Sequence, residues 1–262
     1  MSTFNYSLEL LQNNSNSKKQ ALKKLAPEFI SIAYTNHTLS FFETTFSTAL
    51  TLKKVTNIKT AVHLPASSFT QEELDKLVVV LQKSTIDSAL ILSGEKKLNK
   101  NSAYTSALEL AKFLSRRLPN LDILCSCHPE TITSEINLQN ELSLMRTKEA
   151  TGCKIFISQI FFDNTMFIHF VNHCRHAGIK AQIRAGIMPI VNKNQLTFVK
   201  KILKLQLPDS FEQVSNDIEL KKIGIQFALN QINMLKKQGI TDFHFFTMDN
   251  LDTVKLLIDG VL

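Results

Sequence analysis

The chain carries C-K-I-F-I-S-Q-I-F-F-D at Cys153–Asp163 and A-G-I-K-A-Q-I-R-A-G-I-M-P at Ala177–Pro189. Each segment contains a short apolar run, and a segment of helical periodicity, Thr165–Ala177, lies between the two runs. This order predicts two parallel strands joined by a helix. Gln159 and the turn Gly186–Pro189 then lie where strands end, and strand ends are where we expect chemistry.

The same alternation of strand and helix extends over the whole chain. The eight expected strands are Phe4–Leu10, Phe29–Tyr34, Thr60–Leu64, Ala89–Gly94, Leu121–Ser126, the strand that begins at Cys153, Ala181–Ile187 and Asp242–Thr247. The expected helices lie near Lys18–Leu25, Leu39–Lys53, Thr70–Leu81, Ala103–Arg116, Asn137–Ala150, Thr165–Ala177, Gln195–Leu205, Asp217–Lys237 and Leu251–Leu257.

Glycines support this alternation. Gly152, Gly178 and Gly239 each end a helical pattern and shortly precede a strand, and this is the position where a helix commonly ends in a left-handed residue. Eight strand–helix repeats with short connections favour an α/β fold, a closed (β/α)8 TIM barrel that forms a single domain over residues 1–262. A doubly wound open sheet is the alternative that the pattern leaves open.

Composition limits the classes of partner. The net charge is +7, but the lysine pairs are spread along the chain without interleaved aromatic residues, so nucleic acid is not the expected partner. No apolar run approaches the ~18–20 residues that span a bilayer, so no membrane is expected. The N-terminus lacks the pattern of a secretory signal. The four cysteines show neither a CxxC pair nor a zinc spacing, so we expect buried thiols in a cytoplasmic protein.

Candidate functional residues stand at the carboxyl ends of the expected strands, which meet at one rim of a barrel. They are Glu9, Tyr34, His63, Ser93 to Glu95, His128 to Glu130, Gln159, Asp163, Arg184 to Pro189, and Thr247. Carboxylates, a histidine and a glutamine on one rim can bind an aromatic heterocycle and move a proton. For each residue alone, a solvated rim position or a helix cap remains an open interpretation.

Several other kinds of site are not indicated. The chain has no G-x-G-x-x-G, no G-x-x-x-x-G-K-[ST] and no G-x-S-x-G, so neither a dinucleotide fingerprint, a P-loop nor a nucleophile elbow is expected. His169, His173 and His176 lie mostly off the apolar stripe of their helix and have no acidic partner nearby, so we expect no metal site. His244, within F-H-F-F, is expected to be packed or at the rim.

Motifs in the second half of the chain match one known family. They are S-Q-I-F-F-D at 158–163, A-G-I-M-P-I-V-N at 185–192, L-P-D-S-F at 207–211 and Q-G-I-T-D-F-H-F-F-T-M at 238–248. With these motifs the chain resembles methylenetetrahydrofolate reductase, the flavin-dependent barrel enzyme of one-carbon metabolism. Weaker matches extend to the N-terminus.

The resemblance implies roles for individual residues. Glu9 is the implied general acid, and Glu95 is the carboxylate between flavin and folate. Gln159 and Gln195 are the implied folate contacts. The residues implied on the flavin side are His63, Ser93, Gly94, Glu95, Tyr104, Thr105, His128, Glu141, Lys148 and Phe246.

The resemblance also implies cofactors, a mechanism and partners. FAD is the implied cofactor, with NADH or NADPH as the reductant. The hydride passes to methylenetetrahydrofolate in a ping-pong sequence, and methyltetrahydrofolate is formed. Glu9 must then stay protonated near neutral pH, which requires a raised pKa at a partly desolvated rim. A homo-oligomer or a paralogous partner subunit is the expected assembly.

The chain departs from the family pattern on the flavin and nicotinamide sides. The family's L-R-G-D reads L-S-G-E here, and its ending Y-T-L-N-R reads F-T-M-D-N. The departures are Ala33, Ser93, Glu95, Leu144, Thr147 and Asn250. They favour a second interpretation, in which a barrel of the same ancestry no longer catalyses and serves as a partner subunit or as a folate- or flavin-binding protein.

Overall fold

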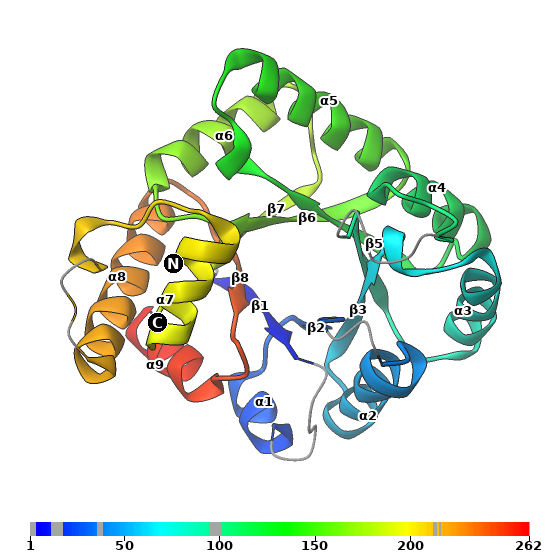
Figure 1. Cartoon of the computed structure of the whole chain (residues 1–262), viewed down its shortest axis with the longest axis horizontal. Coiled ribbons are helices and arrows are strands. Elements are labelled where there is room, and N and C mark those ends of the chain that lie inside the picture. The colour runs from blue at the N-terminus through cyan, green and yellow to red at the C-terminus, as the bar shows by residue number, and fades with distance from the viewer. Residues whose placement is uncertain are drawn as a thin grey trace.

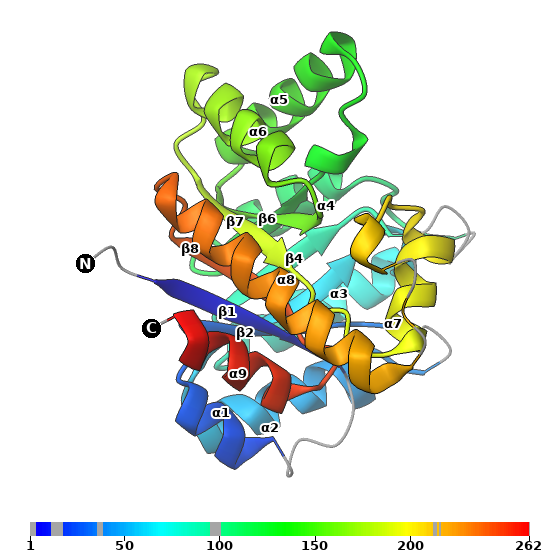
Figure 2. The same cartoon turned by 90° about the vertical axis from the view of Figure 1, so that its left-hand side faces the viewer.

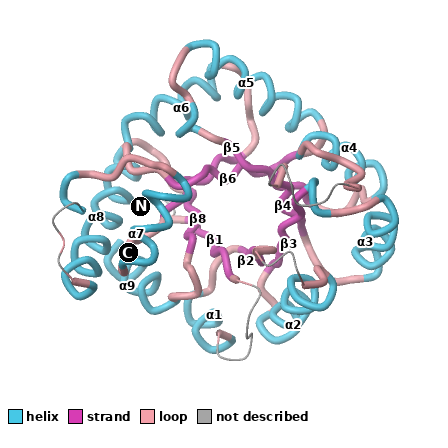
Figure 3. The backbone as a smooth tube through the Cα atoms, viewed as in Figure 1, coloured by secondary structure: helices cyan, strands magenta, loops and turns pink. Residues whose placement is uncertain are grey.

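Eight parallel strands close into a barrel and follow one another around it in chain order (Figures 1 and 3). The computed structural model describes residues 4–11, 18–35, 39–94, 101–211, 214 and 216–261. The strands are β1 (Asn5–Leu10), β2 (Phe29–Ile32), β3 (Lys59–Pro65), β4 (Ser88–Leu92), β5 (Asp122–Cys127), β6 (Cys153–Ile160), β7 (Gln182–Ile187) and β8 (Asp242–Phe246). The predicted barrel is confirmed, and the open sheet is excluded because β8 pairs with β1.

Helices surround the barrel (Figure 3). They are α1 (Lys19–Leu25), α2 (Ser47–Thr56), α3 (Gln71–Lys83), α4 (Ala107–Arg117), α5 (Glu135–Ala150), α6 (Asn164–His176), α7 (Lys193–Thr197), α8 (Asp217–Lys237) and α9 (Leu251–Val261). The side view in Figure 2 shows α7 at the end of the barrel toward which the strands run. Within the described ranges, no helix has the length and apolar character needed to cross a membrane.

Side-chain caps fix where two of the helices begin. Thr70 and Glu73 form the expected capping box at the start of α3. Ser106 and Glu109 form a second capping box, so α4 starts at residue 107 and not near 103 as predicted. Two other expected helices contain π-helical turns, at Phe42–Phe46 and Phe198–Leu203, which apolar spacing does not distinguish from α-helix.

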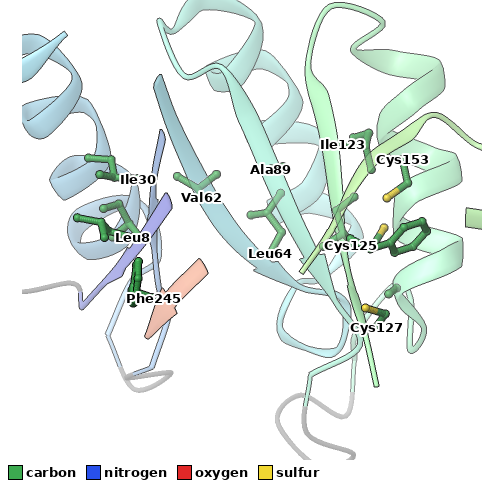
Figure 4. Packing of buried hydrophobic residues seen from close by; sticks show 14 of the residues in the cluster. Leu8, Ile30, Val62, Leu64, Ala89, Ile123, Cys125, Cys127, Cys153 and Phe245 are labelled. Atoms are coloured by element: carbon green, nitrogen blue, oxygen red, sulfur yellow. The ribbon is translucent and has the colours of Figure 1, made fainter. Parts of the chain in front are cut away.

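Strand alternation places the candidate site inside the barrel. Leu8 and Leu10 on β1 are fully buried in the layer between strands and helices, shown in part in Figure 4. Because successive side chains on a strand face opposite ways, Glu9 between them faces the interior. The same argument turns His63 of β3 inward. The apolar filling of the interior is contributed by Phe29, Ala61, Leu90, Leu124 and Ile157.

The cysteines and one arginine complete the core. All four cysteines are free and buried, as expected, and Cys125 and Cys127 both belong to the layer between strands and helices (Figure 4). Arg184 was predicted among the strand-end candidates, but its side chain is fully buried and pairs with Glu28. Glu28 immediately precedes β2, so Arg184 is directed toward the amino ends of the strands. Its guanidinium carbon lies 4.7 Å from the centre of the Phe29 ring.

Candidate functional site

A cavity of about 410 Å³ opens at the carboxyl ends of the strands. Apolar groups, among them Leu92 and Ile157, form part of its wall. The structure brings eight of the predicted site residues to this cavity, namely Glu9, Tyr34, His63, Ser93, Gly94, His128, Gln159 and Phe246. An apolar wall with a few convergent polar groups is the usual character of a small-molecule site.

Glu9 is the carboxyl group at the centre of this arrangement. It is the second-last residue of β1 and lies between Ser31 of β2 and Phe246 of β8 in the strand register. Its side chain is 17% exposed. Burial, and secondarily the charge of Asp249, raises the pKa of Glu9 to about 7. A carboxyl group with this pKa can hold a proton near neutral pH and donate it.

His63 is the histidine beside Glu9. Its Nε2 atom lies 3.0 Å from the hydroxyl oxygen of Ser31 and 3.7 Å from Oε2 of Glu9. Burial lowers the pKa of His63 to about 3, so the imidazole is neutral at neutral pH. The contact with Glu9 is therefore not an ion pair, and no positive charge on His63 stabilises the carboxylate form of Glu9.

Gly94 follows β4 at the cavity wall. Its φ angle is +81°, and a Cβ atom there would meet Oγ of Ser67 at 2.3 Å. The turn therefore requires glycine for both conformation and space. The hydroxyl of Ser93 accepts a hydrogen bond from the amide of Ala107, at 3.3 Å, at the start of α4. Glu95, the predicted second carboxylate, lies outside the described residues.

Two predicted flavin-side residues, Glu141 and Lys148, do not line this cavity. The ammonium of Lys148 is directed inward and donates a hydrogen bond to the carbonyl of Ser126 at 3.0 Å; the residue is 2% exposed. The amide of His128 donates to Oε1 of Glu141 at 3.0 Å. Burial alone would raise the pKa of Glu141, but its hydrogen bonds to His128 and the charge of His128 lower it.

Tyr104 and Thr105 lie at the approach to α4. Tyr104 is half-buried, and its ring centre lies 5.6 Å from that of Phe113. The amide of Thr105 donates a hydrogen bond to Glu109 at 3.4 Å, so this backbone belongs to the capped start of α4. The roles predicted for these two residues in holding a flavin stay predictions.

The two predicted folate contacts differ in their surroundings. The register between β6 and β7 shifts between Ile157 and Ile160, and Gln159 at this irregularity lines the cavity. Its side-chain oxygen accepts a hydrogen bond from the amide of Ile160 at 2.9 Å. Gln195 is 4% exposed, and its side-chain oxygen accepts from the amide of Val191 at 2.7 Å. Gln195 therefore supports the loop after β7.

The site suits the ring of a flavin better than the diphosphate of FAD. The main cavity offers an apolar wall and hydrogen-bonding groups to a heterocyclic ring. A second cavity of about 320 Å³ is lined by Thr131, Asn137, Asn140, Glu141 and Leu144. Glu141 lines this second cavity, and its hydrogen-bond partner His128 lines the first. Since the second cavity carries no cationic side chain among the described residues, it suits sugar hydroxyls better than a diphosphate.

Two serines of the cavity were not predicted as site residues, whereas the predicted Glu130 and Asp163 do not line it. Ser126 and Ser158 line the cavity, and strand alternation applied strictly would have indicated Ser126. Burial raises the pKa of Glu130 to about 7. Asp163 caps α6 by accepting from the amides of Thr165 and Met166. Asn250, which replaces a family arginine, accepts from the amide of Thr253 at 3.1 Å at the start of α9.

The histidines of α6 lie off its buried face, and His244 is packed, as predicted. His169, His173 and His176 are exposed on α6, whereas Phe167, Phe170 and Cys174 form its buried face. His244 is fully buried, and its Nδ1 atom lies 2.7 Å from the hydroxyl of Ser7. In the part of the chain that the structure describes, no group of three histidine, cysteine or acidic side chains is placed to bind a metal ion.

Comparisons with known proteins agree with this architecture. A solved structure of an uncharacterised protein from Clostridium thermocellum, which binds two copies of 5-methyl-5,6,7,8-tetrahydrofolic acid, superposes with a TM-score of 0.71 at 15% identity and covers 98% of this chain and 95% of its own. This similarity shows the shared fold.

Sequence relatives are closer. The 5,10-methylenetetrahydrofolate reductase of Buchnera aphidicola from Acyrthosiphon pisum is 27% identical over 247 residues, which cover 92% of this chain and 84% of the relative. That of Escherichia coli is 25% identical over 236 residues, with 88% and 79% covered. The family model named methylenetetrahydrofolate reductase matches residues 9–261. The chain therefore belongs to the methylenetetrahydrofolate reductase family.

Proposed function

We propose that the protein reduces methylenetetrahydrofolate to methyltetrahydrofolate, with FAD as the bound cofactor and NADH or NADPH as the reductant. The observation that carries this proposal is the position of Glu9, a carboxyl group that lines the cavity and whose pKa burial raises to about 7. The relatives of the chain are named for this reaction. When bound, FAD supplies hydride transfer between the nicotinamide and the folate.

The residues of the cavity have separate tasks in this reaction. Glu9 donates its proton to the ring nitrogen that leaves as the imidazolidine ring of the folate opens, and so assists formation of the iminium ion that accepts hydride. His63 stays neutral and leaves that proton on Glu9. Gln159 binds the folate from β6. His63, Gly94 and Phe246 hold the flavin ring by packing and hydrogen bonding. Reductant and folate use the same cavity in turn, which is the basis of a ping-pong sequence.

The test separates the two half-reactions. The purified protein should show flavin absorbance, which NADH or NADPH bleaches and methylenetetrahydrofolate restores. Glu9→Gln should abolish the recovery by folate and leave the bleaching nearly intact. Glu72→Gln on the exposed start of α3 is the matched control and should leave both steps unchanged. Loss of both steps in Glu9→Gln alone would mean that Glu9 is structural.

A second candidate function is a barrel that binds a folate or a flavin without catalysis, as a partner subunit of an active relative. Two observations favour it. The ammonium of Lys148 points inward to Ser126, and the second cavity is lined by Leu144, which is 37% exposed, with no cationic side chain among its described lining residues. These residues therefore offer little to the diphosphate of FAD. A colourless protein that takes up no added FAD, yet binds methyltetrahydrofolate in calorimetry, would support this candidate and contradict the first.

A further inference from the structure

The segment after β8 holds the backbone at Glu9 and at Leu11. The hydroxyl of Thr247 donates a hydrogen bond to the carbonyl of Glu9 at 2.6 Å and accepts one from the amide of Asp249 at 3.0 Å. The amide of Leu11 donates to Oδ1 of Asp249 at 3.0 Å. Asp249 is thus fixed against the carboxyl end of β1, beside the proposed acid.

Asp249 forms an ion pair beside the carboxyl end of β1. The ammonium of Lys18 lies 2.7 Å from its Oδ1 atom, and the two side chains are 8% and 17% exposed, Lys18 being the more buried. Its other oxygen, Oδ2, is buried without a partner among the described residues. The ion pair and the amide donor therefore fix Oδ1 of Asp249 at the carboxyl end of β1.

The backbone conformation around Asp249 orients its carboxylate. Met248 and Asp249 have φ angles of 45° and 62°, so two successive residues that are not glycine adopt the left-handed region. Such residues cost of order 1 kcal/mol or more each and persist where the surrounding contacts demand them. Here the conformation turns the Asp249 carboxylate back toward β1, where it meets Leu11 and Lys18.

The groups that face Glu9 come from three directions. His63 faces it from β3 and is neutral because burial lowers its pKa to about 3. Asp249 lies on the segment after β8, and its charge contributes to the raised pKa of Glu9; the cation Lys18, which precedes α1, is paired with Asp249. From β2, the nearest polar group in the register is the uncharged Ser31. In the described residues, no hydrogen-bond donor contacts the Glu9 carboxyl group, so two carboxyl groups share one rim in unequal surroundings.

We propose that Asp249 is a positioning residue for the proton of Glu9: Lys18 and the Leu11 amide fix the Asp249 carboxylate beside the carboxyl end of β1, and its negative charge favours the proton on Glu9. This inference rests on the proposed function, in which Glu9 is the acid. The corresponding residue of the family ending Y-T-L-N-R is asparagine, so the added charge is a feature of this chain. As a consequence, Glu9 remains protonated, and can donate its proton, at a higher pH than it could without this charge.

The test is a direct titration of Glu9 in the protein without added folate or reductant. The side-chain carboxyl ¹³C signal of Glu9 is assigned by its absence in Glu9→Gln. Asp249→Asn keeps an acceptor for the Leu11 amide and tolerates the left-handed backbone. We expect it to lower the titration midpoint of Glu9 by about one pH unit. Asp252→Asn, the same charge change at an exposed position of α9, should leave the midpoint unchanged.

A second variant separates charge from loss of structure. Lys18→Met removes a cation, which cannot stabilise a carboxylate, so the midpoint of Glu9 should stay or rise. If both variants lower the midpoint, opening of the rim to water is the cause and the proposal is wrong. If Asp249→Asn leaves the midpoint unchanged, the proposal is equally wrong, whatever Lys18→Met does.

Enzyme assays give an independent readout. In Asp249→Asn the alkaline limb of the pH profile for folate reduction should move down by the same amount as the midpoint, with the flavin half-reaction unaffected. The titration does not depend on flavin or folate. A shifted midpoint in a protein that reduces no folate would therefore contradict the proposed function and uphold the role of Asp249.

Discussion

The Nε2 atom of His63 lies 3.7 Å from Oε2 of Glu9, and burial moves the pKa values of these two groups in opposite directions. The pKa of Glu9 rises to about 7 and that of His63 falls to about 3. Between these two pH values both side chains are mainly uncharged. The pair is therefore a carboxylic acid beside a neutral imidazole, which is an arrangement suited to proton donation.

Glu9→Gln should stabilise the protein at alkaline pH. The pKa of Glu9 is raised in the folded state, so between about pH 4.5 and pH 7 the folded chain binds more protons than the unfolded chain, and stability falls as pH rises. The amide has no such dependence. At pH 8 the variant should gain up to about 3 kcal/mol relative to the wild type, and the gain should vanish below about pH 4.5. Urea unfolding at a series of pH values measures it; a gain independent of pH would contradict the burial argument.

His63→Asn should flatten the acid limb of the stability profile. The pKa of His63 is lowered in the folded state, so the wild type loses stability as pH falls from about 6.5 toward 3, where the unfolded chain binds the proton first. At pH 5 this loss is about 2 kcal/mol. The variant should not show this acid-dependent loss of stability, even if the substitution lowers its stability at pH 7 through lost packing. The comparison is made in the Glu9→Gln background, because Glu9 titrates in the same range with the opposite sign.

Much of the fold follows from periodicity in the sequence. The closed barrel was predicted from the apolar runs, the capping box at Thr70 and the glycines after three helices. Each of these features reflects a local conformational preference, and the tertiary packing is consistent with all of them. Alternation then turns Glu9 and His63 inward, since each stands between two residues that face the helices. The cavity lies where these inward residues end, and for this reason eight of the predicted site residues line it.

The remaining features depend on packing that no local pattern reports. Lys148 is placed on the inner face of α5 by its spacing, but only the structure shows its ammonium on the Ser126 carbonyl. Arg184 reads as a strand-end residue, yet a long side chain reaches its partner Glu28 in the other direction. The orientation of the Asp249 carboxylate depends on a left-handed backbone at residues that are not glycine, and this conformation is difficult to predict from the sequence.

Lys148→Met should reveal whether this lysine is structural or holds a phosphate. Its buried ammonium donates to Ser126 and compensates the charge of Glu141, so its loss should cost about 2–4 kcal/mol of stability. Lys154→Met, which removes an ammonium from a side chain that is 66% exposed beside Asp122, should cost less than about 1 kcal/mol. If Lys148 is structural, Lys148→Met should weaken the binding of riboflavin and of FAD to the same degree. A selective loss of FAD affinity would show instead that the ammonium turns outward to the phosphates.

Gly186→Ala should damage the folate side of the cavity. A Cβ atom at Gly186 would lie 2.4 Å from the carbonyl of Ser158, 2.8 Å from the ring of Phe246 and 3.2 Å from the carbonyl of Gln159. Two of these three contacts are with backbone, so β6 must move, and such overpacking typically costs about 1–3 kcal/mol. Because the displaced backbone carries Gln159, we expect folate affinity to fall more than flavin affinity.

The matched control for that change is Gly260→Ala in α9. Its Cβ would meet only the side chain of Leu229, at 2.9 Å for the nearer methyl, and a flexible side chain can give way. Alanine is favoured over glycine in a helix by up to about 1 kcal/mol, so this variant should be neutral or stabilised in thermal unfolding. If Gly186→Ala behaved like Gly260→Ala and kept its folate affinity, the close approach of β7 to the irregular part of β6 would not position Gln159. The folate contact would then have to be sought on the other strands.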